Sequence, residues 1–550
     1  MSALIDNIRE SVIGAGAPVR TPFGDMPLVY ADYTASGRAL GFIEDYIRQQ
    51  VLPYYANTHT ETSFTGAQTT AFREQARDEI RRAVNGNSED QVIFCGSGAT
   101  AAINKLIDIL GMRLPRDLAE HYALETHIPA NERPVVFIGP YEHHSNELPW
   151  RESIADVEAI PLTPQGQICM QTLEQKLQQY AERPLKIGSF SAASNVTGIK
   201  SDVEGVTALL KRHGALAFWD YAAAAPYVGI DMNGAAPLDA IFISPHKFIG
   251  GPGTPGILVA KAAIMNNTVP AVVGGGTVMY VTPEDHLYIA DHQRREEGGT
   301  PAIVEAIRAG LVFKLQQEVG TDEIHRRETE FVDRAVRIFA DHPNLEIMGN
   351  PAAPRLSIMS LRFKYGSKDL HYGFVVSLLN DLFGIQVRGG CSCAGPYGHT
   401  LLGMDMDYSR AIETEIQAGT MILRPGWVRL NFNYFIDEAE FDYLVRAITL
   451  VAEHGWRLLP FYQFDTSAGV WRYLNQQAAT CSDLGALSFV NYCQQQHHAP
   501  TEKIELDGQL EAAEQTLLSA RYQEGSSTLA LNQSAENLRW FVLPQEVAAA

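Results

Sequence analysis

Ala240-Ile-Phe-Ile-Ser-Pro-His-Lys-Phe-Ile-Gly-Gly-Pro-Gly-Thr-Pro-Gly256 places a single lysine, Lys247, between an apolar run and a glycine-rich turn. The apolar run predicts a buried strand, so Lys247 should lie at a strand end, where α/β enzymes place their reactive groups. An amine there loses solvation and deprotonates more readily, as Schiff-base formation with an aldehyde cofactor requires. Ser244 and His246 could hydrogen-bond the phosphate of such a cofactor. We therefore interpret Lys247 as an anchor for pyridoxal phosphate, with a surface-loop lysine as the alternative.

The sequence around this stretch alternates strand-like and helix-like runs from about residue 85 to residue 260. Such alternation predicts an α/β fold with a largely parallel sheet covered on both faces. The turn at 250–256 is short, so the last two strand-like runs should form an antiparallel hairpin. The predicted strands are Gln91–Phe94, Val135–Ile138, Leu185–Phe190, Ala215–Trp219, Ile241–Ile243 and Gly256–Ala260, and the clearest helices are Ala101–Leu110 and Val203–His213.

The chain beyond residue 300 changes pattern and predicts a second, smaller α+β domain. Its markers are two helix-like runs, Pro301–Glu318 and Glu323–Ala340, and two strand-like runs, Arg355–Arg362 and Trp427–Phe432. The expected division is an N-terminal segment 1–45 that packs with the small domain, a large domain 46–309, a small domain 310–459 and an extension 460–550. The extension has no repeat or catalytic motif.

Composition excludes several classes of function. The 550 residues include 43 Lys and Arg against 64 Asp and Glu, a net charge of −21, which disfavours general binding to nucleic acid or an anionic membrane. Six cysteines in so long a chain do not indicate a disulfide scaffold, and the N-terminus has no basic segment followed by an apolar run, so we expect a cytoplasmic protein. No apolar run approaches the roughly 20 residues that span a bilayer.

Four other segments fit the same cofactor. Gly98-Ala99-Thr100 opens a predicted helix, whose free N–H groups and dipole suit a phosphate, although small residues also serve helix packing alone. Asp220 ends another predicted strand, where a carboxylate would keep a pyridine nitrogen protonated; a turn or N-cap aspartate is the alternative.

The remaining two segments also follow predicted strands. His143 could stack on a cofactor ring and shuttle protons. Zinc bound by His143 and His144 is disfavoured because no third ligand stands at helical spacing, and no metal site is expected. Asn195 could reach the ring hydroxyl or a substrate carboxylate, and an ordinary turn asparagine is the alternative.

From about residue 28 to residue 455 the sequence resembles the class V aminotransferases of pyridoxal-phosphate fold type I. Within them it is most similar to cysteine desulfurases and selenocysteine lyases of the SufS-like kind. The resemblance implies a mainly parallel seven-stranded sheet and pyridoxal 5'-phosphate as cofactor. The matching segments, in family order, are Tyr30–Ser36, Gly98–Thr100, Glu142–Trp150, Ser194–Val196, Asp220, Ser244–Lys247 and Glu296–Pro301.

The resemblance also implies roles in sulfur chemistry. Cys393 matches the nucleophile that accepts sulfur as a persulfide, and Arg388 matches an arginine upstream of it. Arg429 matches the arginine that binds the substrate α-carboxylate, a bidentate task that lysine performs poorly. Thr300 matches a residue that reaches a phosphate across a dimer interface, so a homodimer is expected.

The implied reaction converts L-cysteine to L-alanine and passes sulfur on, with a sulfur-acceptor protein as a further partner. The sequence departs from the family at Ala223, where desulfurases usually have a glutamine, at Cys391, and in an insertion within 394–426. Cys391 could relay sulfur, form a disulfide with Cys393, or do neither; a metal site through Cys391, Cys393 and His399 lacks an evident fourth ligand. There are two alternatives to a cysteine desulfurase. One is another class V reaction (transaminase, C–S lyase or epimerase), and the other is a binding protein with this fold.

Overall fold

A seven-stranded sheet forms the centre of the large domain in the computed structural model, which describes residues 2–58, 60–474, 483–494, 503–521 and 526–548. The strands are β4 (Asp90–Cys95), β5 (Val135–Ile138), β6 (Asp156–Ala159), β7 (Lys186–Ser191), β8 (Leu216–Asp220), β9 (Ala240–Ile243) and β10 (Gly256–Lys261). Their order is β4-β10-β9-β8-β7-β5-β6, and only β10 runs antiparallel to its neighbours. The predicted mainly parallel sheet is therefore confirmed, as is the antiparallel pairing of β9 with β10.

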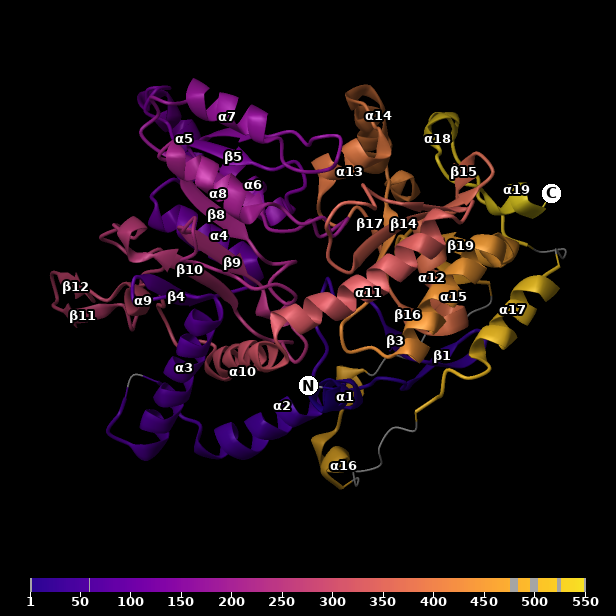
Figure 1. The fold of residues 1–550 in the computed structure, drawn as a ribbon, viewed down its shortest axis with the longest axis horizontal. Coiled ribbons are helices and arrows are strands. Elements are labelled where there is room, and N and C mark those ends of the chain that lie inside the picture. Colours follow the sequence, from indigo (N-terminus) through magenta and orange to yellow (C-terminus); the bar gives the residue numbers. More distant parts are fainter. Residues whose placement is uncertain (1, 59, 475–482, 495–502, 522–525, 549–550) are drawn as a thin grey trace.

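Helices cover both faces of this sheet (Figure 1). Successive strand residues point to opposite faces. Phe218 therefore packs in one apolar cluster, with α4 (Gly98–Ile109) and α6 (Leu148–Arg151), whereas Ala217 and Trp219 pack in the other, with α7 (Met170–Gln179) and α8 (Val203–Arg212). These strands are buried on both faces, which explains their nearly continuous apolar sequences. The helices between residue 41 and residue 319 are α2 (Gly41–Tyr46), α3 (Phe64–Ala83), α4 (Gly98–Ile109), α5 (Arg116–His121), α6 (Leu148–Arg151), α7 (Met170–Gln179), α8 (Val203–Arg212), α9 (His292–Arg295) and α10 (Ile303–Val319).

A smaller sheet of order β13-β14-β18-β17 lies in the second lobe (Figure 1). It comprises β13 (Leu345–Ile347), β14 (Ile358–Tyr365), β17 (Arg388–Gly390) and β18 (Trp427–Asn431), with β15 (Lys368–Asp369) paired to β14. The long helices of this lobe are α11 (Thr321–Ala340), α12 (Tyr372–Phe383) and α15 (Glu438–His454). The register of β17 and β18 sets Arg388 opposite Arg429.

The N-terminal segment contacts the smaller lobe. Its β3 (Val29–Tyr30) pairs in parallel with β16 (Ile385–Gln386), and Arg9 Nε donates to the carbonyl of Phe435 at 2.8 Å. The pairing places Asp32, two residues after β3, beside the smaller sheet. The other elements of this segment are α1 (Ser2–Glu10), β1 (Pro18–Thr21) and β2 (Gly24–Pro27).

The insertion and the C-terminal extension pack against each other. Tyr408 Oη of α14 (Met406–Gln417) donates to the carbonyl of Leu538 at 2.8 Å, so a helix of the insertion holds the end of α18 (Gln533–Leu538). Parts of the expected extension, 475–482, 495–502, 522–525 and 549–550, lie outside the described residues. The elements are α13 (Gly395–Leu402) and α14 (Met406–Gln417) in the insertion, and β19 (Tyr462–Asp465), β20 (Val470–Tyr473), α16 (Phe489–Gln494), α17 (Gln509–Ser519), α18 (Gln533–Leu538) and α19 (Pro544–Ala548) in the extension.

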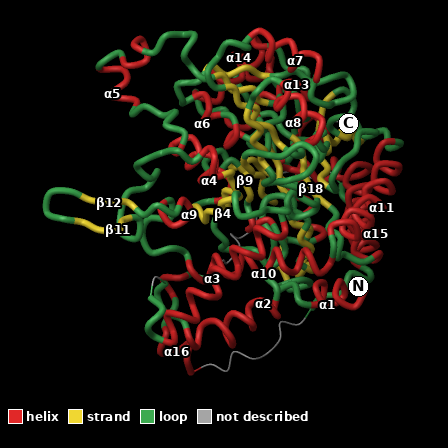
Figure 2. Tube along the Cα trace, turned by 60° about the vertical axis from the view of Figure 1, so that its left-hand side comes forward, coloured by secondary structure: helices red, strands yellow, loops and turns green. Residues whose placement is uncertain are grey.

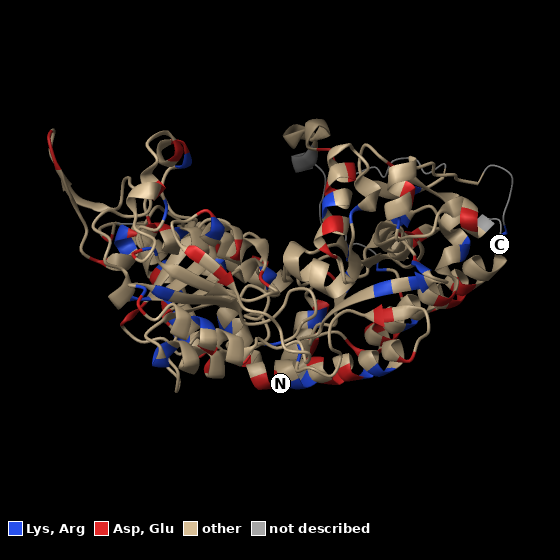
Figure 3. Ribbon diagram, turned by 90° about the horizontal axis from the view of Figure 1, so that it is seen from above, with Lys and Arg blue, Asp and Glu red and all other residues tan. Residues whose placement is uncertain are grey.

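A hairpin of β11 (Val278–Val281) and β12 (His286–Tyr288) projects from the large domain (Figure 2). Its Met279 and Tyr280 are exposed. Acidic and basic side chains are mixed across both lobes (Figure 3). Among the described residues no helix combines the length and apolar character needed to cross a bilayer.

Candidate active site

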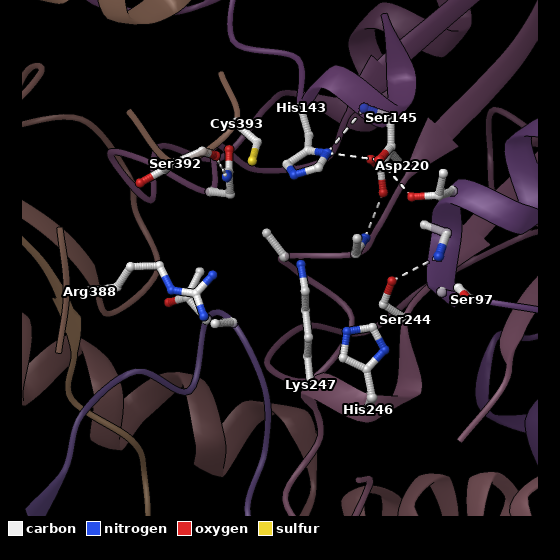
Figure 4. Close-up of a pocket in the computed structure, with 18 of the residues that line it drawn as sticks. Ser97, His143, Ser145, Asp220, Ser244, His246, Lys247, Arg388, Ser392 and Cys393 are labelled. Atoms are coloured by element: carbon white, nitrogen blue, oxygen red, sulfur yellow. Dashed lines mark hydrogen bonds between the residues drawn. The ribbon is translucent and has the colours of Figure 1, made fainter. Parts of the chain in front are cut away.

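A cavity of about 910 Å³ lies where the carboxyl ends of the large-domain strands meet the loops of the smaller sheet. Side chains from both lobes point into it: in Figure 4, Lys247 rises from below, His143 and Cys393 lie beside each other at the top, and Arg388 lies at the left. The structure therefore brings together in one cavity nearly all the residues singled out from sequence. Those that line it are Gly98, Ala99, Thr100, His143, Asn195, Asp220, Ser244, His246, Lys247, Arg388, Cys393 and Arg429.

Lys247 ends a short 3-10 turn, Pro245–Lys247, which is separated from the end of β9 by Ser244 alone. Pro245 begins the turn at a position where its fixed φ is favourable. Burial lowers the pKa of Lys247 to about 8, against the opposing effect of the Asp220 carboxylate. A substantial fraction of the amine is therefore neutral and nucleophilic near pH 8.

Asp220 is the last residue of β8 and its side chain is almost fully buried. The N–H of Ala222 donates to its Oδ1 at 2.8 Å, which fixes the carboxylate at the strand end. Burial raises the pKa of Asp220, while Lys247 lowers it. A buried carboxylate of this kind favours a cationic partner placed against it.

The start of α4 provides the small, N–H-rich surface predicted from sequence. Gly98 has a φ of 57°, and a Cβ there would lie 2.9 Å from Ser244 Oγ and 3.1 Å from His246 Cε1, so only glycine fits. The N–H of Ala99 donates to Ser244 Oγ at 2.9 Å, and the hydroxyls of Thr100 and Ser145 lie 2.6 Å apart. These groups converge at a helix N-terminus, which favours an anion.

His143 is held by its own turn. The N–H of Ser145 donates to His143 Nδ1 at 3.1 Å, so in the neutral ring the proton is on Nε2. Burial, together with the nearby Lys247, lowers the pKa of His143 to about 4. The imidazole is therefore neutral at physiological pH and presents an N–H to its surroundings.

Glu142, to which sequence reasoning gave no role, lies beneath this turn. Its carboxylate is buried and accepts hydrogen bonds from the N–H groups of Gly139 and Ser191, from Ser191 Oγ and from Asn146 Nδ2. Burial raises its pKa to about 7. The carboxylate joins the loop after β5 to the end of β7, and so fixes the segment that carries His143.

The loop that carries Cys393 is held at three points. Asn195 Nδ2 donates to the carbonyl of Ser392 at 2.8 Å, the N–H of His144 donates to the carbonyl of Cys393 at 2.8 Å, and Gly395 N–H donates to His144 Nε2 at 3.0 Å. Ser392 and Cys393 both have a φ of 55°, a left-handed conformation that costs non-glycine residues about 1–2 kcal/mol each. His144 is thus a loop clamp, a function that its position beside His143 in the sequence did not reveal.

Arg388 and Arg429 line the cavity, and both form an ion pair with Asp32. Asp32 Oδ1 accepts from Arg429 Nη2 at 3.3 Å and Asp32 Oδ2 accepts from Arg388 Nε at 3.1 Å. Arg429 is buried and also donates to the carbonyl of Asn195 at 3.1 Å, whereas its Nε has no partner among the described residues. Burial lowers the pKa of Arg429, and Asp32 opposes that effect. Asp32 therefore orients both guanidinium groups, a role that its position in the opening turn did not predict.

Cys391 and Cys393 both line the cavity, and both are free thiols in this structure. Cys393 is exposed and Cys391 is partly buried. Ala223 also lines the cavity. Thr300 is exposed and is the one sequence-predicted residue that does not line the cavity of its own chain. Among the described residues no group of three His, Cys, Asp or Glu side chains is arranged to hold a metal ion.

Comparison with known proteins identifies relatives over most of the chain. The family model for aminotransferase class-V matches residues 29–444. A probable cysteine desulfurase from Halalkalibacterium halodurans is 29% identical over 378 residues, which cover 67% of this chain and 85% of that protein. A probable cysteine desulfurase from Staphylococcus aureus is 28% identical over 377 residues, covering 67% of this chain and 84% of that protein.

Solved structures share the same fold. The apo cysteine desulfurase from Thermococcus onnurineus superposes with a TM-score of 0.63 at 22% identity, covering 80% of this chain and 99% of that one. The cysteine desulfurase CsdA from Escherichia coli, in an S-sulfonic acid form, superposes with a TM-score of 0.60 at 19% identity, covering 77% of this chain and 94% of that one. At these identities the superpositions establish the fold.

Proposed function

Because the chain belongs to the aminotransferase class-V family, we propose that it is a pyridoxal-phosphate-dependent cysteine desulfurase that converts L-cysteine to L-alanine and leaves the sulfur on Cys393. The observation that carries this proposal is the presence of a lysine with a lowered pKa and an exposed cysteine in the same cavity. The lysine accounts for the cofactor, and the cysteine provides an acceptor for sulfur.

The side chains fit pyridoxal phosphate. The N-terminus of α4 with Thr100 and Ser244 would hold the phosphate, and Asp220 would hold the pyridine nitrogen. Asn195 Oδ1 is buried with no hydrogen-bond partner among the described residues, an unsatisfied acceptor that the ring hydroxyl would satisfy. His143 would lie against the ring face. When bound there, the cofactor supplies an electron sink for the carbanion at the substrate α-carbon.

The chain's own residues supply binding and proton transfer. Arg429, oriented by Asp32, would bind the α-carboxylate of the amino acid. Lys247 Nζ, a substantial fraction of which is neutral near pH 8, would take the α-proton and return one to the product. His143 Nε2 carries a proton that it can donate.

The sulfur step belongs to Cys393. Its thiolate Sγ would attack the substrate sulfur, so that an S–S bond forms as the substrate C–S bond breaks. The products are alanine and a Cys393 persulfide, and a thiol of an acceptor protein can take the sulfur in a second exchange. The clamp of His144 and Asn195 would keep Cys393 directed into the cavity during this attack.

Incubation of the purified protein with L-cysteine and a reductant tests the proposal. We expect alanine and sulfide from the wild type and neither from Cys393→Ala. A Cys393→Ala variant with undiminished turnover would favour another class V reaction, the alternative that Ala223 supports because its side chain has no group to hydrogen-bond the cofactor.

A homodimer forms part of this proposal. Thr300 is exposed on its own chain and lies outside that chain's cavity, which is consistent with a role in the cavity of a second copy. Light scattering should give twice the chain mass of 60.6 kDa. A monomer with full activity would contradict this assignment.

A further inference from the structure

The end of the C-terminal extension returns to the smaller lobe and pairs with it. The N–H of Asp369, in β15, donates to the carbonyl of Trp540 at 3.2 Å, and the N–H of Val542 donates to the carbonyl of Asp369 at 2.9 Å. Phe541 between them is completely buried. This segment, residues 539–543, is therefore an integral part of the lobe (Figure 1).

Trp540 contacts two elements that form the cavity wall. Its Nε1 donates to the carbonyl of Leu423 at 3.0 Å, and its indole stacks on Tyr372 with 6.0 Å between ring centroids and 8° between planes. Tyr372 lines the cavity, as does Arg424, the residue after Leu423. One side chain of the extension thus holds two wall residues that lie far from it in sequence.

The Tyr372 ring in turn supports the strand that leads to the cysteines. A Cβ at Gly389, in β17, would lie 2.6 Å from Tyr372 Cδ2, and a Cβ at Gly426 would lie 2.9 Å from Tyr372 Cε1. Side chains at these two positions would collide with the ring. The glycines therefore allow the ring to pack directly on β17, which precedes Cys391 and Cys393, and on the backbone just before β18.

We propose that Trp540 is a positioning residue of the active site, which fixes Tyr372 and the Leu423–Arg424 turn and through them the loop of Cys393. Its effect on turnover rests on the proposed desulfurase function, but its effect on the loop does not. The extension, which has no catalytic motif of its own, thereby completes the wall from which the nucleophile projects. Trp540 packs on Tyr372, Tyr372 packs on Gly389 of β17, and β17 leads directly into the loop that carries Cys393.

Two substitutions separate the contacts of Trp540. Trp540→Phe keeps an aromatic ring on Tyr372 but loses the hydrogen bond to Leu423, whereas Trp540→Leu keeps only a smaller apolar side chain and loses both contacts. Trp456→Leu is the matched control, because Trp456 is also partly buried, donates Nε1 to the Glu453 carbonyl at 3.0 Å and packs on a tyrosine, but that tyrosine, Tyr365, does not line the cavity.

The experiment uses the holoenzymes and measures two rates, alkylation of Cys393 by iodoacetamide, located by mass spectrometry, and alanine formation from cysteine. For Trp540→Leu we expect at least about threefold faster alkylation, because the loop opens more often, and about tenfold lower kcat/KM, because the thiol is misplaced. For Trp540→Phe we expect an alkylation rate and a kcat/KM between those of Trp540→Leu and the wild type, and closer to those of the wild type. The absorbance of the bound cofactor should be unchanged in both variants.

The outcomes distinguish this inference from the proposed function. Rates for Trp540→Leu that equal those of Trp456→Leu overturn the positioning role. If the wild type forms no alanine, the proposed function fails, and the alkylation rates alone decide the role of Trp540. Should Trp540→Leu not fold, Trp540→Phe decides the question: alkylation of Cys393 faster than in the wild type, through the lost hydrogen bond to Leu423, supports the positioning role, and wild-type alkylation overturns it.

Discussion

Replacement of Asp32 by asparagine tests how the substrate arginine is oriented. Asp32 and Arg429 have side-chain exposures of 11% and 5%, so their ion pair is well shielded from water, whereas Arg388 is 57% exposed. Loss of one partner from a buried pair costs about 3–5 kcal/mol, and an exposed pair contributes about 0–1 kcal/mol. We therefore expect Asp32→Asn to lower the free energy of unfolding by about 3 kcal/mol, almost all of it through Arg429.

The same variant should impair substrate binding. An asparagine in place of Asp32 accepts from one guanidinium only, so Arg429 and Arg388 lose their common anchor and the α-carboxylate site loses its geometry. We expect the KM for cysteine to rise about tenfold, and kcat to change less, because the lost contact serves the bound substrate and the transition state alike.

The assays are urea unfolding and alanine formation at varied cysteine concentration. Asp90→Asn is the control, since Asp90 is a buried acid 2.7 Å from Lys261 Nζ at the opposite end of β4 and does not line the cavity. The control should lose stability and keep its KM. A KM for Asp32→Asn within twofold of wild type, with a stability loss equal to that of the control, would refute the orienting role.

Three further predictions follow from other groups. Borohydride reduction of the holoenzyme should attach one cofactor covalently to Lys247, and Lys247→Ala should retain none under denaturing conditions; labelling elsewhere by mass spectrometry would contradict the anchor. His144→Ala removes the acceptor of the Gly395 N–H, so persulfide formation measured by mass spectrometry should fall about tenfold while cofactor uptake is unchanged; equal persulfide formation would exclude the clamp. Burial raises the pKa of Glu328 to about 8, so its contribution to stability is fully present below pH 4.5 and is lost as the pH rises to about 8. The stabilising effect of Glu328→Gln in urea unfolding should therefore grow by roughly 3–5 kcal/mol between pH 4.5 and pH 8.5, and an equal effect at both pH values would contradict this.

The sequence alone was sufficient to predict site residues that lie next to a recognisable strand pattern. Lys247 and Asp220 each end an apolar run, and strand ends of a parallel sheet meet at one edge, so their convergence could be inferred without coordinates. The antiparallel β10 was predictable from the short turn before it. The strand predicted to begin at Arg355 begins at Ile358 instead, because the backbone at Arg355 forms an isolated bridge with Ile199 and not with a strand of the smaller sheet.

Residues whose role depends on distant partners were not predictable. Asp32 and Arg429 are 397 positions apart, and the pairing that brings them together requires β3 to join the smaller lobe. Trp540 carries no chemical signal in sequence, since its significance lies in stacking on Tyr372. Such contacts are set by tertiary packing, which hydrophobic periodicity and motif spacing do not encode.

The central claim, that Cys393 receives sulfur from cysteine, is tested most directly by mass spectrometry of the holoenzyme after one turnover with L-cysteine and without an acceptor. We expect one added sulfur on Cys393 and an equal amount of alanine, with Cys391→Ser still loaded at Cys393. Alanine formed without sulfur on Cys393, or full turnover by Cys393→Ala, would contradict the claim.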